Sequence, residues 1–191
     1  MPNDNTGQNN ISNSIDFIQA ENARYHNLIH TLRNGYAYCR MIIDEGHNVD
    51  FIHEEVNESY VKLTGLSDVT GRRLTEVLPA IVALHPDFIE KHRQVVETGI
   101  SDQFEYYLEP LKKWYDISLY RPQEGCVASI FSDITARKEV EEALRQSEER
   151  FRKLFESHWV IKMILEPETG FIIDANQASA DFYGWSIDEL R

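Results

Sequence analysis

The chain of 191 residues is 42% hydrophobic and 27% charged, a composition typical of soluble globular proteins, and its formal net charge at pH 7 is −13. An acidic chain repels phosphate groups, so the composition argues against binding to nucleic acids or to anionic membrane surfaces. The two cysteines, Cys39 and Cys126, are too few for a disulfide framework and are expected to be reduced thiols of a cytoplasmic protein.

Residues 1–13 are polar and rich in asparagine, which predicts a disordered tail. They contain neither a basic n-region nor an apolar h-region, so they do not form a signal peptide. Nowhere does an apolar run approach the roughly 20 residues of a membrane span. These features predict a cytoplasmic location and no membrane contact for this segment.

Residues 14–34 have the pattern of an amphipathic helix. Their apolar positions follow one another in alternating steps of three and four residues, which is the spacing of a coiled-coil seam. One polar residue interrupts this seam, which consists of Ile15, Ile18, Asn22, Tyr25, Ile29 and Leu32. The pair Asn34-Gly35 then predicts the end of the helix.

A β-hairpin is predicted for residues 36–56, where two apolar runs flank a turn at residues 44–48. A short helix follows, with Asn57 as its N-cap and Gly65 as its stop. Pro86 is a favourable first residue for a longer helix. The residues that share its apolar face are Phe88, Ile89, His92, Val95 and Val96.

Three strand-like runs at residues 104–108, 114–120 and 126–134 are separated by turn residues, which indicates an antiparallel meander. From there the chain becomes dense in charged residues, and a long helix is predicted for residues 136–156. Its narrow apolar seam favours pairing with a partner helix, and the alternative is a solvated amphipathic helix packed on its own domain. The dimer contacts expected on the two flanking helices are Ile15, Ile18, Tyr25, Val140, Leu144 and Phe151.

The sequence contains an internal repeat. Arg150 and Phe151 occupy the second amphipathic run as Arg24 and Tyr25 occupy the first. The spacing from Asn57 to Gly65 recurs from Asn176 to Gly184. The second copy reaches Arg191 without counterparts of the later strands, and half a sheet cannot close a core of its own. We therefore expect residues 157–191 to be the truncated start of a second domain.

Several segments resemble the motifs of one family of sensor domains. Residues 55–65 resemble a strand leading into an Asn-capped helix, residues 71–79 a Gly-Arg segment ending in proline, and residues 113–116 a penultimate strand. Residues 131–137, Phe-Ser-Asp-Ile-Thr-Ala-Arg, match the Asp-Ile-Thr exit motif. On these motifs, residues 21–191 resemble PAS domains joined by a connector helix, as in bacterial sensor histidine kinases and diguanylate cyclases.

The resemblance implies an α+β fold, in which a five-stranded antiparallel sheet carries short helices on one face and amphipathic helices flank the domain. It places a PAS domain at residues 35–135 and a coiled-coil connector at residues 136–156. The family's strand order sets the first strand beside the last. Cys39 and Cys126 are therefore expected on neighbouring strands, with no bond required between them.

Asp133 and Thr135 stand where the last strand gives way to the connector helix. Either side chain can bond to the free N–H groups at a helix N-terminus, so a capping role alone is one interpretation. The resemblance adds that this junction, with Arg137 of the exit motif, carries the signal out of the sheet. We predict that Asp133→Ala uncouples input from output.

An aromatic interior with several polar groups is expected for the PAS-like region. Such a set suits a pocket for a small organic or aromatic ligand, and the alternative is a filled core whose hydroxyl groups bond to the backbone. The candidate pocket residues are Tyr36, Tyr38, His53, Tyr60, His92, Tyr106 and Tyr115, with Trp114 beside them.

The sequence identifies no cofactor. In haem-binding PAS domains the axial histidine comes from the helix that carries His92, but a core histidine bonded to a carbonyl is the favoured interpretation. Leu74 stands where light-sensing relatives carry a reactive cysteine, so a flavin–cysteinyl adduct is not expected. Paired-cysteine zinc spacing, phosphate loops and nucleophile elbows are missing from the sequence, so we expect neither a metal site nor catalytic residues.

Together these features predict a sensory input module with no catalytic activity of its own. The module is expected to bind a small molecule or a partner and to form a homodimer through its flanking helices. Its output domain, beyond this segment, is expected to be a histidine kinase or a diguanylate cyclase. The alternative is a ligand-free module for dimerisation or protein interaction.

Overall fold

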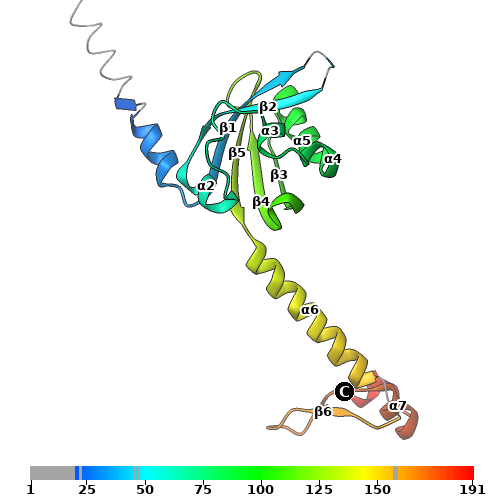
Figure 1. Ribbon diagram of the computed structural model, residues 1–191. Coiled ribbons are helices and arrows are strands. Elements are labelled where there is room, and N and C mark those ends of the chain that lie inside the picture. The colour runs from blue at the N-terminus through cyan, green and yellow to red at the C-terminus, as the bar shows by residue number, and fades with distance from the viewer. Residues whose placement is uncertain (1–19, 22, 45, 47, 157–158) are drawn as a thin grey trace, which may run out of the picture. The chain divides into compact units, whose positions relative to one another are not determined.

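The computed structural model describes residues 20–21, 23–44, 46, 48–156 and 159–191 (Figure 1). The chain divides into two compact units, residues 1–135 and 136–191. The predicted tail at residues 1–13 and the seam positions Ile15, Ile18 and Asn22 lie outside the described residues. Among those that are described, residues 23–31 are helical, as the amphipathic pattern of the N-terminal segment predicts.

The first unit is built on one antiparallel sheet with the order β2-β1-β5-β4-β3. The predicted hairpin and the predicted meander both form. The first strand pairs with the last, as the resemblance implies, so the α+β PAS fold is confirmed. The strands are β1 (Gly35–Ile43), β2 (Val49–Val56), β3 (Asp102–Leu108), β4 (Lys113–Tyr120) and β5 (Cys126–Asp133).

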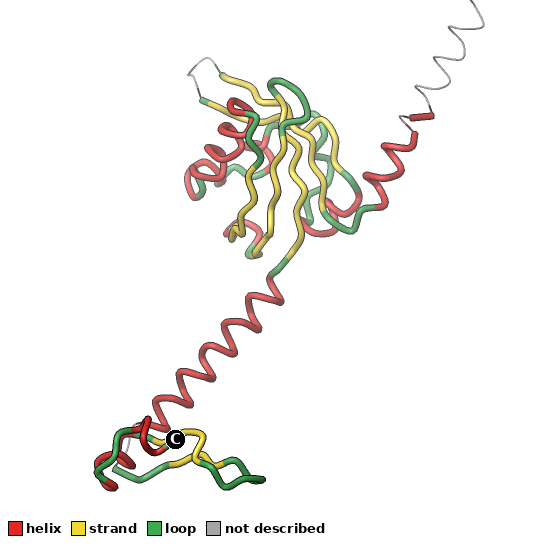
Figure 2. Tube along the Cα trace, turned by 180° about the vertical axis from the view of Figure 1, so that it is seen from behind, coloured by secondary structure: helices red, strands yellow, loops and turns green. Residues whose placement is uncertain are grey.

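Short helices fill the chain between β2 and β3 and cover one face of the sheet (Figure 2). Their buried residues, among them Tyr60, Leu74 and Phe88, belong to the same core as the inward-facing strand residues. Pro86 begins the longest of them, and its apolar face is buried as predicted. These helices are α2 (Glu58–Thr64), α3 (Leu74–Val77), α4 (Ile81–Leu84) and α5 (Pro86–Thr98), and a 3-10 turn, η1 (Glu109–Leu111), joins β3 to β4.

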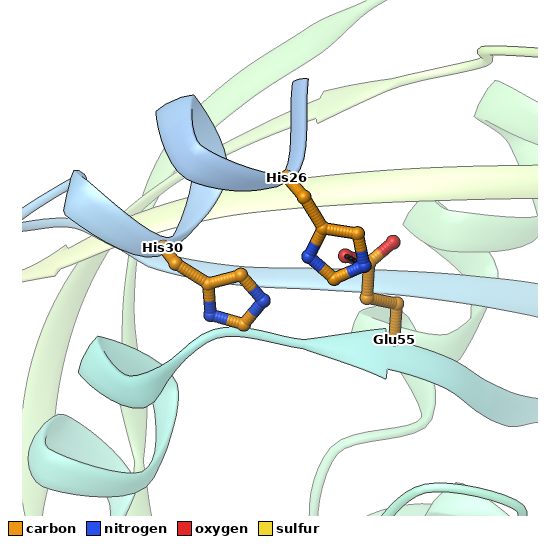
Figure 3. A group of neighbouring side chains, drawn as sticks. All are labelled: His26, His30 and Glu55. Carbon is orange, nitrogen blue, oxygen red and sulfur yellow. Dashed lines mark ion pairs between the residues drawn. The ribbon is translucent and has the colours of Figure 1, made fainter. Parts of the chain in front are cut away.

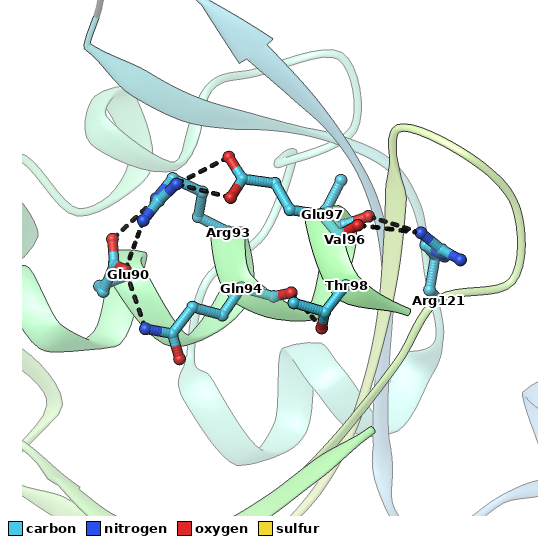
Figure 4. A network of polar contacts seen from close by, with 7 residues as sticks. All are labelled: Glu90, Arg93, Gln94, Val96, Glu97, Thr98 and Arg121. Atoms are coloured by element: carbon cyan, nitrogen blue, oxygen red, sulfur yellow. Dashed lines mark hydrogen bonds and ion pairs between the residues drawn. The ribbon is translucent and has the colours of Figure 1, made fainter. Parts of the chain in front are cut away.

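Arg121 anchors the C-terminal end of α5 (Figure 4). Its guanidinium Nη1 donates to the carbonyl oxygens of Val96 at 3.1 Å and Glu97 at 3.3 Å, which have no partner further along the helix. Gly99 ends the helix with a φ of 74°, and a Cβ at this position would collide with the Arg121 side chain. The positive φ therefore favours glycine here, and a larger residue would also force the end of the Arg121 side chain to move.

Strand register decides which side chains enter the core. On β1, Ala37 and Cys39 are buried, while Tyr36 and Tyr38 lie on the opposite face. Cys126 pairs with Arg40, next to Cys39, so the two cysteines lie on neighbouring strands but point to opposite faces of the sheet. Both are free thiols.

The second unit is small. Helix α6 (Thr135–Glu156) begins directly after β5 and leads into the two-stranded sheet of β6 (Met163–Leu165) and β7 (Ile172–Ala175). The short helices α7 (Gln177–Tyr183) and α8 (Ile187–Leu190) follow. The buried core of this sheet and these helices consists of Ala175, Ala180 and Leu190.

Helices in the described part of the chain are all too short or too polar to span a membrane. Even α6, with 22 residues, has a charged surface along most of its length. This finding agrees with the absence of a long apolar run in the sequence.

Candidate functional site

A cavity of about 70 Å³ lies between the sheet and its helices. Residues of all five strands line it on the side of the sheet, and residues of α2, α3, α5 and η1 line it elsewhere. Its walls are almost entirely apolar, with a few polar groups between them. The lining residues are Ala37, Cys39, Phe51, His53, Tyr60, Thr64, Leu66, Leu74, Leu78, Phe88, His92, Leu108, Leu111, Tyr115, Ile117, Ser129 and Phe131.

The structure brings some of the predicted pocket residues to this cavity and places the others elsewhere. The predicted residues that line the cavity are His53, Tyr60, His92 and Tyr115. Tyr36 and Tyr38 do not line it, because the alternation along β1 turns Ala37 and Cys39 inward instead. Trp114 does not line it either, because it precedes the buried Tyr115 on β4 and therefore lies on the opposite face of the strand. Tyr106 also does not line it; this side chain packs against the core, and its hydroxyl donates to the Asp87 carboxylate at 2.5 Å.

Two histidines supply the main polar groups of the cavity. His92 Nδ1 lies 2.8 Å from the carbonyl oxygen of Phe88, so this nitrogen carries the proton and Nε2 accepts from the Ser129 hydroxyl at 3.3 Å. His53 has the same arrangement, with Nδ1 facing the carbonyl of Arg72 at 3.2 Å and Nε2 facing the Tyr60 hydroxyl at 3.3 Å. Both rings are thereby fixed in one tautomer.

The interior of the cavity is electrically neutral near pH 7. Burial lowers the pKa of His92 to about 4 and also lowers the pKa of His53. Burial raises the pKa of the Cys39 thiol to about 12, so this thiol is protonated and unreactive. The lining therefore favours an uncharged guest with a small number of hydrogen-bonding groups.

The cavity does not fit a haem or a flavin. It is smaller than the roughly 150 Å³ cavity that holds a benzene molecule in other proteins. His92 Nε2, the nitrogen that would bind a haem iron, faces Ser129 instead. Leu74 lines the cavity at the position where the resemblance places the reactive cysteine of light sensors. A cavity of this size has room for water or another very small molecule.

The junction between β5 and α6 is closed by a compact set of hydrogen bonds. The backbone N–H and the hydroxyl of Thr135 both donate to Asp133 Oδ1, at 2.9 and 2.6 Å. The backbone N–H of Trp114 donates to the Thr135 hydroxyl at 3.0 Å. Lys113 Nζ lies 3.0 Å from Asp133 Oδ2. The junction thus ties the start of α6 to β4.

Electrostatics stabilise the charged form of Asp133. Burial alone would raise the pKa of this carboxyl, but the hydrogen bonds from Thr135 and the ion pair with Lys113 outweigh burial and lower the pKa below its ordinary value. Arg137, the third predicted relay residue, pairs with Glu141 one turn further along α6, at 3.1 Å. It belongs to the helix surface, while Asp133 and Thr135 belong to the junction.

One backbone carbonyl connects the cavity to the junction. The carbonyl oxygen of Leu63, in the last turn of α2, accepts from the Tyr115 hydroxyl at 3.0 Å and from Lys113 Nζ at 2.8 Å. Tyr115 lines the cavity and is 1% exposed. Lys113 also holds Asp133. A continuous path of contacts therefore runs from the cavity wall to Thr135, the first residue of α6.

Asn57 joins the N-terminal helix to the sheet and to α2. Its Oδ1 accepts from the backbone N–H groups of Tyr36 at 3.0 Å and Tyr60 at 2.8 Å, so it caps α2. Its Nδ2 donates to the carbonyl oxygens of Ile29 at 3.0 Å and Asn34 at 2.9 Å. Gly65 ends α2 in the left-handed conformation, with a φ of 74°.

Among the apolar seam residues that the structure describes, Ile29 and Leu32 are half-buried and the others are exposed. Tyr25 is 61% exposed on the N-terminal helix, and Val140, Leu144 and Phe151 are 68%, 59% and 55% exposed on α6. Within a single chain these side chains bury little of their surface. They remain candidate contacts for a partner helix.

Sequence reasoning missed several cavity residues. The predicted pocket does not include Cys39, Phe51, Ser129 or Phe131, and the carbonyl of Leu63 has no sequence signal at all. The strand alternation could have identified Cys39, once the inward face of β1 was known.

Comparison with known proteins gives structural likeness only. The sequence matches neither a known family model nor a curated protein. An RNA-binding light-oxygen-voltage receptor is similar over 68% of this chain, at 14% identity and a TM-score of 0.47, and this chain spans 37% of that receptor.

Two further solved structures are single domains. A domain of an HTR-like protein from Haloarcula marismortui covers 55% of this chain over all of its own length, with 17% identity and a TM-score of 0.41. A PAS domain from Colwellia psychrerythraea covers 60% of this chain over 97% of its own length, with 14% identity and a TM-score of 0.41.

Proposed function

We propose that this segment, with its PAS fold at residues 35–135, is the sensory input module of a signal-transduction protein. The observation that carries the proposal is the contact path from the cavity to α6, through Tyr115, the Leu63 carbonyl, Lys113 and Asp133. In this proposal a small molecule acts at the cavity and the connector helix carries the response to an output domain. That domain would be a histidine kinase or a diguanylate cyclase.

The proposed relay works through a shared acceptor. Tyr115 and Lys113 donate to the same carbonyl oxygen, so a guest that displaces the Tyr115 ring changes the hydrogen bonding of Lys113 as well. Lys113 in turn holds the carboxylate that accepts both hydrogen bonds from Thr135. A guest can shift this arrangement only by as much as it prefers one of the two conformations.

We propose in addition that residues 157–191 begin a second PAS domain. Asn176 supports this, since its Oδ1 accepts from the N–H groups of Lys162 and Ser179, both at 3.1 Å. Its Nδ2 donates to the carbonyls of Phe155 at 3.0 Å and Val160 at 2.9 Å. Large side chains such as Phe171 and Phe182, both 69% exposed, are those that further strands would cover.

A ligand-free module for dimerisation is the second candidate function. Two observations favour it, the small volume of the cavity and the exposed seam of α6. Native mass spectrometry of the purified chain separates the two functions, because a retained small molecule supports sensing of a ligand. Sedimentation of the chain and of a Leu144→Glu variant tests the homodimer, which the charged side chain should dissociate.

The relay can be tested without knowing the ligand, because a larger side chain can occupy the cavity. Cys39→Met adds volume inside it, while Cys39→Ser keeps the volume nearly unchanged and serves as the matched control. We expect Cys39→Met to speed amide hydrogen exchange in the first turn of α6 by about threefold or more, with no such change in the control. Equal exchange in both variants would refute the relay.

A further inference from the structure

Two histidines of the N-terminal helix and a glutamate of β2 lie together (Figure 3). His26 and His30 are one helical turn apart, and their rings stack with centroids 4.9 Å apart and an angle of 4° between planes. Glu55 faces them from the sheet. One ligand atom from each of the three residues lies within 4.8 Å of the other two.

Glu55 has an unsatisfied oxygen in this cluster. Its Oε1 is buried and has no hydrogen-bond partner among the described residues. The nearest ring nitrogen, His26 Nε2, lies 3.8 Å away, which is too far for a hydrogen bond. A buried carboxylate oxygen without a partner is costly, so this position favours a cation beside it.

We propose that His26, His30 and Glu55 form a binding site for a divalent transition-metal ion of the Zn²⁺ class. Two imidazoles and one carboxylate are a donor set found in zinc sites, and two histidines four residues apart on a helix present their nitrogens to one ion. Neutral nitrogen ligands select such ions over Mg²⁺ and Ca²⁺, which prefer oxygen.

The geometry requires only a small adjustment to close around an ion. Ligands of a tetrahedral Zn²⁺ lie about 2.0–2.2 Å from the metal and therefore closer together than the ligand atoms lie here. His26 and His30 are exposed, so both rings are free to turn toward Glu55 without disturbing the core. The exposed side of the cluster leaves a fourth position for water.

A metal at this site would fasten the N-terminal helix to the sheet. His26 and His30 lie on either side of Ile29, whose carbonyl accepts from Asn57, and the Ser59 hydroxyl donates to the Leu32 carbonyl at 2.6 Å. The ion would therefore add a third attachment to an end of the helix that two hydrogen-bonding side chains already hold. This site is separate from the cavity and does not depend on the relay.

The test uses the full chain without a histidine tag and Zn²⁺ alone, measured by competition with a chromophoric chelator. We expect one Zn²⁺ per chain with micromolar or tighter affinity. Single variants His26→Gln, His30→Gln and Glu55→Gln should each weaken binding at least about tenfold, because even partners of metal ligands contribute that much. Glu54→Gln, the same change at the preceding residue of β2, should leave the Zn²⁺ affinity within about twofold of the wild type.

Two further measurements distinguish a metal site from a merely structural cluster. Zn²⁺ should slow amide exchange at residues 23–34 in the wild type and not in His30→Gln. Glu55→Gln should leave the melting temperature of the metal-free chain unchanged or raised, while it weakens binding. The proposal is overturned if Zn²⁺ binds no tighter than about 100 μM, or if the three ligand variants keep the wild-type affinity.

Discussion

Asn57 and Asn176 make equivalent hydrogen bonds in the two units of this chain. Each side-chain oxygen accepts from a strand-side N–H and caps a short helix, and each amide group donates to the end of an amphipathic helix and to the loop after it. The second unit keeps this arrangement with only two strands. This set of hydrogen bonds around the asparagine, called the asparagine clamp below, is therefore local and does not need the five-stranded sheet.

Asn57→Ala should lower the free energy of unfolding of the first unit by about 3 kcal/mol. The substitution removes a helix cap and leaves buried donors and acceptors without partners. Urea denaturation followed by tryptophan fluorescence and circular dichroism measures this change. Asn176→Ala is the matched control, and it should leave the unfolding transition of residues 35–135 unchanged. A loss below about 1 kcal/mol for Asn57→Ala contradicts the role of the clamp.

Stability should fall in mild acid because of His92. Its pKa is about 4 in the folded protein, whereas an unfolded histidine has a pKa near 6.5, so the unfolded state binds the additional proton between these values. The free energy of unfolding should decrease by up to about 1.4 kcal/mol per pH unit as the pH falls from about 6.5 toward 4. His53, whose pKa is also lowered, contributes in the same direction.

His92→Gln tests this assignment. The variant should be less stable than the wild type at pH 7, because it loses a fitted ring, but its stability should depend less on pH between 7 and 5. Urea unfolding at several pH values gives, for each protein, the slope of the free energy of unfolding against pH. Equal slopes for the two proteins would show that His92 does not titrate as its burial requires.

Asp133→Ala should uncouple α6 from the cavity. In the Cys39→Met background, the added substitution removes the acceptor of both Thr135 hydrogen bonds and the partner of Lys113. Exchange in the first turn of α6 should then be fast whether residue 39 is Cys or Met. Asp116→Ala, which removes a carboxylate from the outer face of β4, should leave the difference between Cys39 and Met intact. A persisting difference in the Asp133→Ala background argues against the relay.

Gly99→Ala should destabilise the first unit by about 2 kcal/mol. The new Cβ would sit at a positive φ and would displace Arg121 from the carbonyls at the end of α5. Thermal unfolding measures the loss. Gly99→Ala combined with Arg121→Ala should lose little more than Gly99→Ala alone, because the first substitution already breaks the contact. If the stability losses of the two single variants add in full, the contact of Arg121 with the end of α5 does not depend on Gly99.

Local patterns predicted much of this fold. The caps of α2, the proline at the start of α5 and the Asp-Ile-Thr junction each rest on a few adjacent residues, and the structure contains all three features. The inward face of β1 could not be predicted from hydrophobicity. Ala37 and Cys39 lie on one face and Tyr36 and Tyr38 on the other, and the residues of both faces are apolar enough to be buried. An irregularity of register between Tyr38 and Cys39 obscures the pattern further.

The parts of the candidate sites that sequence reasoning missed depend on contacts between distant residues. The Leu63 carbonyl is a backbone atom and becomes an acceptor only when β4 packs beside α2. The spacing of His26 and His30 is visible in the sequence, but Glu55 joins them only through the docking of the N-terminal helix. Side chains brought together by tertiary packing leave no local signal.

The length of α6 limits which insertions and deletions this protein can tolerate. The helix runs through 22 residues, and each residue adds about 1.5 Å of rise and about 100° of rotation. Deleting one residue after Val140 would carry Leu144 and Phe151 about 100° around the helix axis and break the apolar stripe. Deleting seven would remove Leu144 but would return Phe151 to within about 20° of its former direction. Length changes in whole heptads should therefore be the ones that preserve function.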